Sequence, residues 1–66
     1  MVIVLNGESR EVEHGADLAR VLTDAGFPER GIAVAVDGEV VSRTSWPRYL
    51  PDEGARVEVL TAVQGG

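Results

Sequence analysis

The sequence contains no cysteine and no lysine, and only three of its 66 residues are aromatic. Without cysteine there is no disulfide, no thiolate metal site and no cysteine nucleophile, and the composition fits a reducing compartment. The six positive charges are arginines scattered along the chain, and eleven acidic residues give a net charge of −5. Nucleic-acid binding needs a basic stripe, so nucleic acid is not an expected partner.

Long hydrophobic runs are also missing. The longest apolar stretches, residues 1–5 and 32–36, are too short to span a bilayer. No basic segment precedes the first stretch, so a signal peptide is not expected. We therefore expect a soluble, cytoplasmic protein that contacts no membrane and is monomeric in isolation.

Aliphatic residues make up most of the 44% apolar fraction, which suffices for one compact core. A domain of about 60 residues buries only about 60% of its unfolded surface, so its margin of stability is thin. We expect one domain over residues 1–61. Residues 62–66, which end in Gly-Gly, are expected to form a flexible tail, because glycine is the costliest residue to order.

Two dipeptides with strong hairpin preference divide the chain. Asn6-Gly7 follows a β-branched run, and Asp37-Gly38 follows a second apolar run. A final apolar segment precedes the tail. The predicted strands cover residues 1–5, 8–13, 31–36, 39–41 and 56–61.

One helix is predicted between the second and third strands. Asp17 is a suitable N-cap, and Gly26 is a suitable residue to end the helix. Residues 42–54, which contain two prolines, are expected to be irregular. The apolar residues at helical spacing are Leu18, Val21, Leu22 and Ala25.

The order β-β-α-β-β-β predicts an α+β fold in which a mixed sheet of about five strands packs on one helix. The first strand is expected to pair with either the strand after the helix or the last strand. Alternation along the last strand sends Val57 and Val59 to the core and leaves Leu60 outside. A small apolar patch on the outer face is therefore predicted, and such a patch favours docking. Its members are Val2, Val4, Ala33, Ala35 and Leu60.

The strand order, the small size and the Gly-Gly end resemble ubiquitin-like β-grasp proteins, and the resemblance is closer to the ThiS family of sulfur carriers in thiamin biosynthesis. It covers the whole chain. Two departures, Ser42 where a proline is common and Gln64 where a small residue is common, do not touch the chemistry. The residues that carry the resemblance are Asn6, Leu18, Leu22, Ile32 to Gly38, Val41 to Arg43, Trp46, Asp52 to Gly54 and Gly65-Gly66.

This resemblance implies that the reactive group is the carboxylate of Gly66. An E1-like, ThiF-like enzyme would adenylate it with ATP, and a sulfur donor such as a cysteine desulfurase system would convert it to a thiocarboxylate. A ThiG-like thiazole synthase would receive the sulfur. The chain would then be a co-substrate, not an enzyme, with no bound cofactor and no metal. Gly65 and Gly66 lack Cβ and can thread into a narrow site.

The resemblance and the apolar patch together define the expected partner contacts. We expect them at Leu60, Val4, Ala33, Ala35, Val63 and Gln64. Two alternatives remain open within carriers, a MoaD-like carrier for molybdopterin synthesis or another ubiquitin-like modifier. An alternative of a different class is a non-conjugating β-grasp interaction module whose glycines are only a frayed end.

Other candidate residues favour structural interpretations. His14 is expected in a solvated loop, and Asp52 and Glu53 are expected to form a turn before Gly54. Trp46 is expected to seal the edge of the core, with a partner anchor as its alternative.

Overall fold

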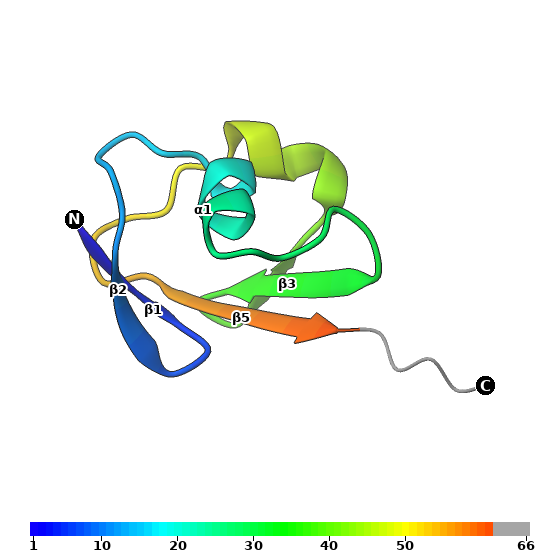
Figure 1. Ribbon diagram of the computed structural model, residues 1–66, viewed down its shortest axis with the longest axis horizontal. Coiled ribbons are helices and arrows are strands. Elements are labelled where there is room, and N and C mark those ends of the chain that lie inside the picture. Colours follow the sequence, from blue (N-terminus) through cyan, green and yellow to red (C-terminus); the bar gives the residue numbers. More distant parts are fainter. Residues whose placement is uncertain (62–66) are drawn as a thin grey trace.

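In a computed structural model, which describes residues 1–61, one helix packs on a five-stranded mixed sheet (Figure 1). The element order confirms the predicted β-β-α-β-β-β fold. The tail predicted over residues 62–66 lies outside the described residues. The elements are β1 (Val2–Leu5), β2 (Glu8–Glu11), α1 (Leu18–Asp24), β3 (Ile32–Val36), β4 (Glu39–Val41), the 3-10 helix η1 (Arg43–Arg48) and β5 (Arg56–Thr61).

The sheet has the strand order β2-β1-β5-β3-β4, so the last strand of the chain is the central strand of the sheet. Of the two partners left open for the first strand, the last strand is the one that pairs with it, in parallel. On its other side β5 runs antiparallel to β3, from Val57 opposite Val36 to Thr61 opposite Ile32. Because β1 ends at Leu5, the final residues of β5 extend beyond it.

Both predicted hairpins are present, and their turns explain why these dipeptides occur. Asn6 and Gly7 have φ of 49° and 83°, and Asp37 and Gly38 have φ of 51° and 87°. Positive φ at both central residues is the type I′ conformation, whose twist matches that of the two flanking strands. Asparagine, aspartate and glycine are the residues that adopt it most readily.

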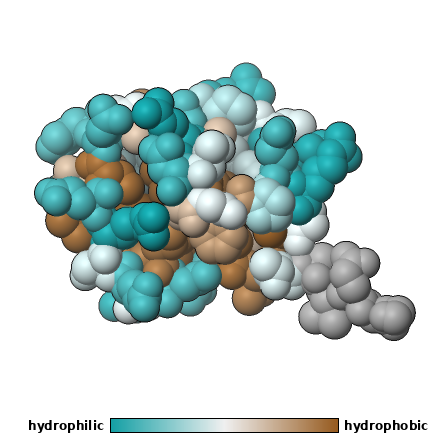
Figure 2. All heavy atoms as spheres, in the orientation of Figure 1, coloured by the Kyte–Doolittle hydropathy of each residue, from teal (hydrophilic) through white to brown (hydrophobic). Residues whose placement is uncertain are grey.

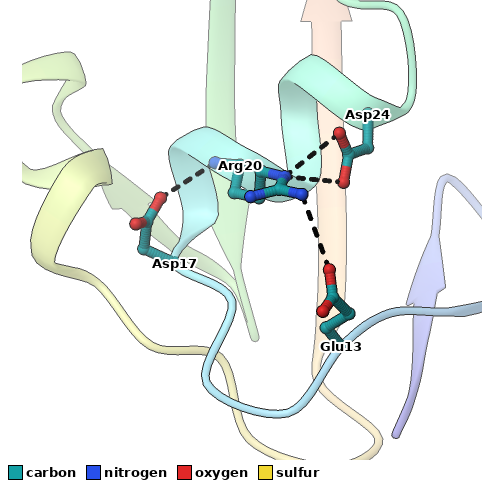
Figure 3. Close-up of polar contacts among 4 residues, drawn as sticks. All are labelled: Glu13, Asp17, Arg20 and Asp24. Atoms are coloured by element: carbon teal, nitrogen blue, oxygen red, sulfur yellow. Dashed lines mark hydrogen bonds and ion pairs between the residues drawn. The ribbon is translucent and has the colours of Figure 1, made fainter.

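Helix α1 begins and ends where its capping residues predict. The Asp17 carboxylate accepts a hydrogen bond of 2.8 Å from the backbone N–H of Arg20. Gly26 has φ of 89° just after the helix, and the N–H of Phe27 donates to the Leu22 carbonyl. Arg20 also pairs with Asp24 and Glu13 on the helix surface (Figure 3). These pairs are more than half exposed, so each contributes at most about 1 kcal/mol.

The core lies between α1 and the inner face of the sheet, and it confirms the predicted alternation. Val57 and Val59 are buried, whereas Leu60 is 71% exposed. Of the four apolar residues predicted for the helix stripe, Leu18, Val21 and Leu22 are buried against the sheet, and Ala25, the C-cap, is partly buried. The buried set comprises Ile3, Leu5, Leu18, Val21, Leu22, Val34, Val36, Val41, Trp46, Ala55, Val57 and Val59.

The segment expected to be irregular differs from the prediction, because part of it forms η1. At its two ends are i to i+3 hydrogen bonds, from Ser45 N–H to the Ser42 carbonyl and from Tyr49 N–H to the Trp46 carbonyl. Trp46 is buried, and its indole N–H donates to the Val41 carbonyl at 2.9 Å. This confirms that Trp46 seals the core.

The second strand is shorter than predicted and ends at Glu11 instead of Glu13. One more pair of backbone bonds follows it, because Val12 N–H donates to the Met1 carbonyl and the Met1 ammonium donates to the Val12 carbonyl, both at 2.8 Å. The four residues of β2 are all exposed and polar, as expected of an edge strand that must not pair with another chain.

Candidate docking face and carboxyl end

The central strand leads directly to the predicted reactive end of the chain. β5 ends at Thr61, paired with Ile32 and on the side of the molecule opposite to Met1 (Figure 1). The predicted site residues Val63, Gln64, Gly65 and Gly66 lie outside the described residues. The last described residue, Thr61, therefore lies at the end of the central strand of the sheet.

The outer face of the sheet carries the predicted apolar residues. Ala33 lies opposite Leu60 across β3 and β5, and Ala35 occupies the same face two pairs further along, opposite Glu58. Val4 lies on this face beside Arg56, apart from the other three. Leu60, Ala33 and Ala35 are thus brought together, whereas Val4 flanks them. Hydrophobic atoms reach the surface along the lower side of the molecule, next to the end of β5 (Figure 2).

A shallow hollow of about 200 Å³ lies on this outer face. Small-molecule sites usually measure roughly 300–1,000 Å³, so the hollow has the size for a single side chain. Sequence reasoning missed Val40, Glu58 and Asn6 as members. Alternation could have found Val40, since its neighbour Val41 points inward and leaves Val40 80% exposed. The lining residues are Asn6, Ala33, Val34, Ala35, Val40, Glu58 and Leu60.

The polar groups of the hollow differ in what they can still bind. The Asn6 amide is engaged, because Oδ1 accepts from Val59 N–H at 2.7 Å and Nδ2 donates to the Val59 carbonyl at 3.3 Å. Glu58 lies opposite Ala35 on β5 and is exposed. Over residues 1–61, the ion pairs within 4.0 Å involve Arg20 and leave Glu58 out. The Glu58 carboxylate is therefore available to a partner.

A second hollow lies on the helix side, between α1 and η1, and measures about 260 Å³. Phe27, Pro28, Trp46 and Pro47 line it, and its polar margin includes the exposed residue Glu29. The indole N–H of Trp46 is already bonded inside the protein. The two hollows therefore lie on opposite sides of the sheet, this one on the helix side and the first one on the outer face.

Metal and membrane features are absent from the described part of the chain. Between Met1 and Thr61, no group of three or more His, Cys, Asp or Glu side chains could hold a metal ion. His14 is exposed in the connection before α1. In the same range, neither length nor apolar character allows a helix to cross a membrane.

Comparison with known proteins gives a family match along almost the whole chain. The model of the ThiS family matches residues 3–66. A thiazole synthase of Paramagnetospirillum magneticum is 27% identical over 66 residues, and one of Magnetococcus marinus is 35% identical over 66 residues. Each match covers 100% of this chain and 20% of the relative. The chain thus spans about a fifth of the length of these curated relatives.

A solved structure has the same fold. The thiamine biosynthesis protein ThiS from Geobacter metallireducens superposes with a TM-score of 0.81 at 23% identity. The match covers 100% of both chains. The likeness extends over the five strands and the helix, and it identifies the fold as the β-grasp fold of a ThiS protein.

Proposed function

This chain belongs to the ThiS family, and on that premise we propose that it carries sulfur on the carboxylate of Gly66 for thiazole formation in thiamin biosynthesis. The observation that carries the proposal is the family match, which runs to Gly66. Two relatives named thiazole synthase, each of which contains a segment similar to the whole chain, support the same pathway. The proposal keeps the division expected from the sequence, a domain over 1–61 and a tail over 62–66, and a cytoplasmic location.

The proposed chemistry takes place on the last residue. A carboxylate oxygen of Gly66 attacks the α-phosphate of ATP in a ThiF-like, E1-like enzyme, and pyrophosphate leaves. The outer sulfur of a persulfide on a donor such as a cysteine desulfurase system then displaces AMP and forms an acyl disulfide with the carrier. A second thiol of the donor system cleaves the S–S bond, forms a disulfide with the donor and releases the thiocarboxylate. The thiazole synthase takes the sulfur. The carrier supplies no catalytic group, so it is a co-substrate and not an enzyme.

Two properties of the sequence support this role for the tail. Gly65 and Gly66 have no Cβ, so the main chain is as narrow there as a peptide can be. Five residues can extend the carboxylate up to roughly 17 Å beyond Thr61. Reach and narrowness are what a carboxylate needs to enter the active site of another protein.

The outer face is the proposed docking surface for these partners. Leu60 lies near the end of β5 opposite Ala33, Ala35 lies opposite Glu58 in the middle of β5, and Val4 flanks them. Val63 and Gln64 would extend the same contact along the tail. We expect Leu60→Glu to weaken partner binding by at least about tenfold, because a charge replaces an apolar contact in the desolvated interface. Unchanged affinity with an unchanged melting temperature would remove this face from the proposal.

Intact mass spectrometry tests the proposed function. The chain is incubated with ATP, the activating enzyme and a sulfur donor, beside a variant with one alanine appended after Gly66. The extension moves the carboxylate by about 3.5 Å and adds a Cβ. A misplacement of about 1 Å can cost about a hundredfold in rate, so the variant should form neither adenylate nor thiocarboxylate. Replacement of Gly66 by Val should have nearly the same effect.

Circular dichroism provides the control, since both variants should melt like the parent chain. Thiocarboxylation of the extended chain at the parental rate would contradict the carrier proposal. It would favour a non-conjugating interaction module instead. Normal activation followed by sulfur transfer to a molybdopterin synthase, and none to thiazole synthase, would point to a MoaD-like carrier.

A further inference from the structure

We propose that the hollow on the outer face binds an arginine side chain of the thiazole synthase, and that Glu58 is the residue that recognises it. This inference rests on the proposed function and adds the chemistry of the partner at the docking face. It joins three observations, the size of the hollow, the arrangement of its apolar walls and the carboxylate beside them.

The shape of the hollow fits the stem of a long side chain. Ala33 and Ala35 have the smallest side chains of the lining, and Val40 and Leu60 rise on both sides with 80% and 71% exposure. An apolar trough of this kind is covered well by methylene groups. Arginine and lysine bury such stems against apolar surface while their charged ends remain at a polar group.

The charge of the hollow selects a cation. Glu58 is opposite Ala35 in the register, so its carboxylate lies beside the trough. Asn6, the other polar side chain of the lining, is held by the main chain of Val59 at both of its amide atoms. The net charge of −5 adds a long-range attraction toward a basic surface.

Arginine suits this arrangement better than lysine. Its planar guanidinium can bind both oxygens of one carboxylate, and it is more weakly hydrated than an ammonium group. It is also enriched at the centre of protein interfaces, where lysine is depleted. The outer side of β5 carries Arg56 two residues before Glu58, but these two side chains form no ion pair within 4.0 Å.

The experiment is titration calorimetry of the carrier with the thiazole synthase of its own organism, at about 0.15 M salt. Glu58→Gln keeps the shape and removes the charge, and it should raise Kd about tenfold. Glu58→Arg places like charges together and should raise Kd at least about 30-fold. Glu29→Arg is the matched control, because it changes the net charge equally on the helix side. It should leave Kd within about threefold.

Melting by circular dichroism is measured on all four chains, and we expect equal stability because both glutamates are exposed. A scan of Arg→Glu variants on the synthase should contain one that restores the affinity of Glu58→Arg. Equal Kd for the Glu58 variants and the parent would overturn this inference and leave the sulfur-carrier proposal standing. If the parent chain does not bind the thiazole synthase, the synthase is not its partner, and both this inference and the partner named under the proposed function are overturned.

Discussion

The side-chain amide of Asn6 pairs with the main chain of Val59 as the peptide group of a neighbouring strand would. Val59 N–H donates to Oδ1 at 2.7 Å and the Val59 carbonyl accepts from Nδ2 at 3.3 Å, although the two residues are 53 positions apart. The same residue forms the hairpin turn with φ of 49°. Asn6 thus closes the side of β5 at the point where β1 ends.

Because Asn6 both forms the turn and bonds to Val59, substitutions can separate the contributions of these two roles to stability. Asn6→Gly keeps the positive φ and loses both bonds to Val59, so unfolding free energy should fall by about 1–3 kcal/mol. For a domain of this size, about 1 kcal/mol corresponds to about 4–8 °C in melting temperature. Asn6→Asp keeps the acceptor for Val59 N–H and should lie between parent and glycine variant. A glycine variant as stable as the parent would show that the pairing contributes nothing.

Two leucines that differ only in location provide a second test. Leu18 is fully buried between α1 and the inner face of the sheet, and Leu60 is 71% exposed on the outer face. Leu18→Ala should cost about 2–5 kcal/mol, because it leaves a cavity. Leu60→Ala should change stability by about 0.5 kcal/mol or less. Chemical denaturation of both variants measures this difference. Comparable losses at the two positions would contradict the assignment of Leu60 to a docking surface.

The N-cap of α1 gives a third prediction. The Asp17 carboxylate satisfies the Arg20 N–H at 2.8 Å, and Asp17→Ala should destabilise the domain by about 1 kcal/mol. Asp17→Asn retains a capping oxygen and is the control, so it should stay within a few tenths of a kcal/mol of the parent. Thermal melting distinguishes the variants. If both substitutions cost the same, the negative charge, and not the hydrogen bond, is what stabilises the helix.

The parts of the fold that follow from local chemistry were predictable from the sequence. Asn6-Gly7 and Asp37-Gly38 each supply two residues that tolerate positive φ, so both hairpins could be identified. The burial of Val57 and the exposure of Leu60 follow from strand alternation. Such features need only neighbouring residues.

Features that depend on distant residues were not predictable in the same way. Nothing in the sequence near Asn6 indicates that Val59 is its partner. η1 was missed because Pro47 suggested an irregular segment. A short 3-10 helix with i to i+3 hydrogen bonds can nevertheless include this proline, as η1 does. The hollow combines Asn6 with residues of β3, β4 and β5. Alternation alone places Val40 on the outer face, but only the strand order brings it to the same hollow as Glu58.

The position of β5 also determines how the domain responds to force. A partner that grips the carboxyl end pulls on the central strand, along its own axis, between β1 on one side and β3 on the other. The hydrogen bonds to β3 run perpendicular to the strands and those to β1 are slanted, so a pull along β5 strains several bonds on each side at the same time. A pull along β5 therefore loads the domain in shear on both sides of its central strand.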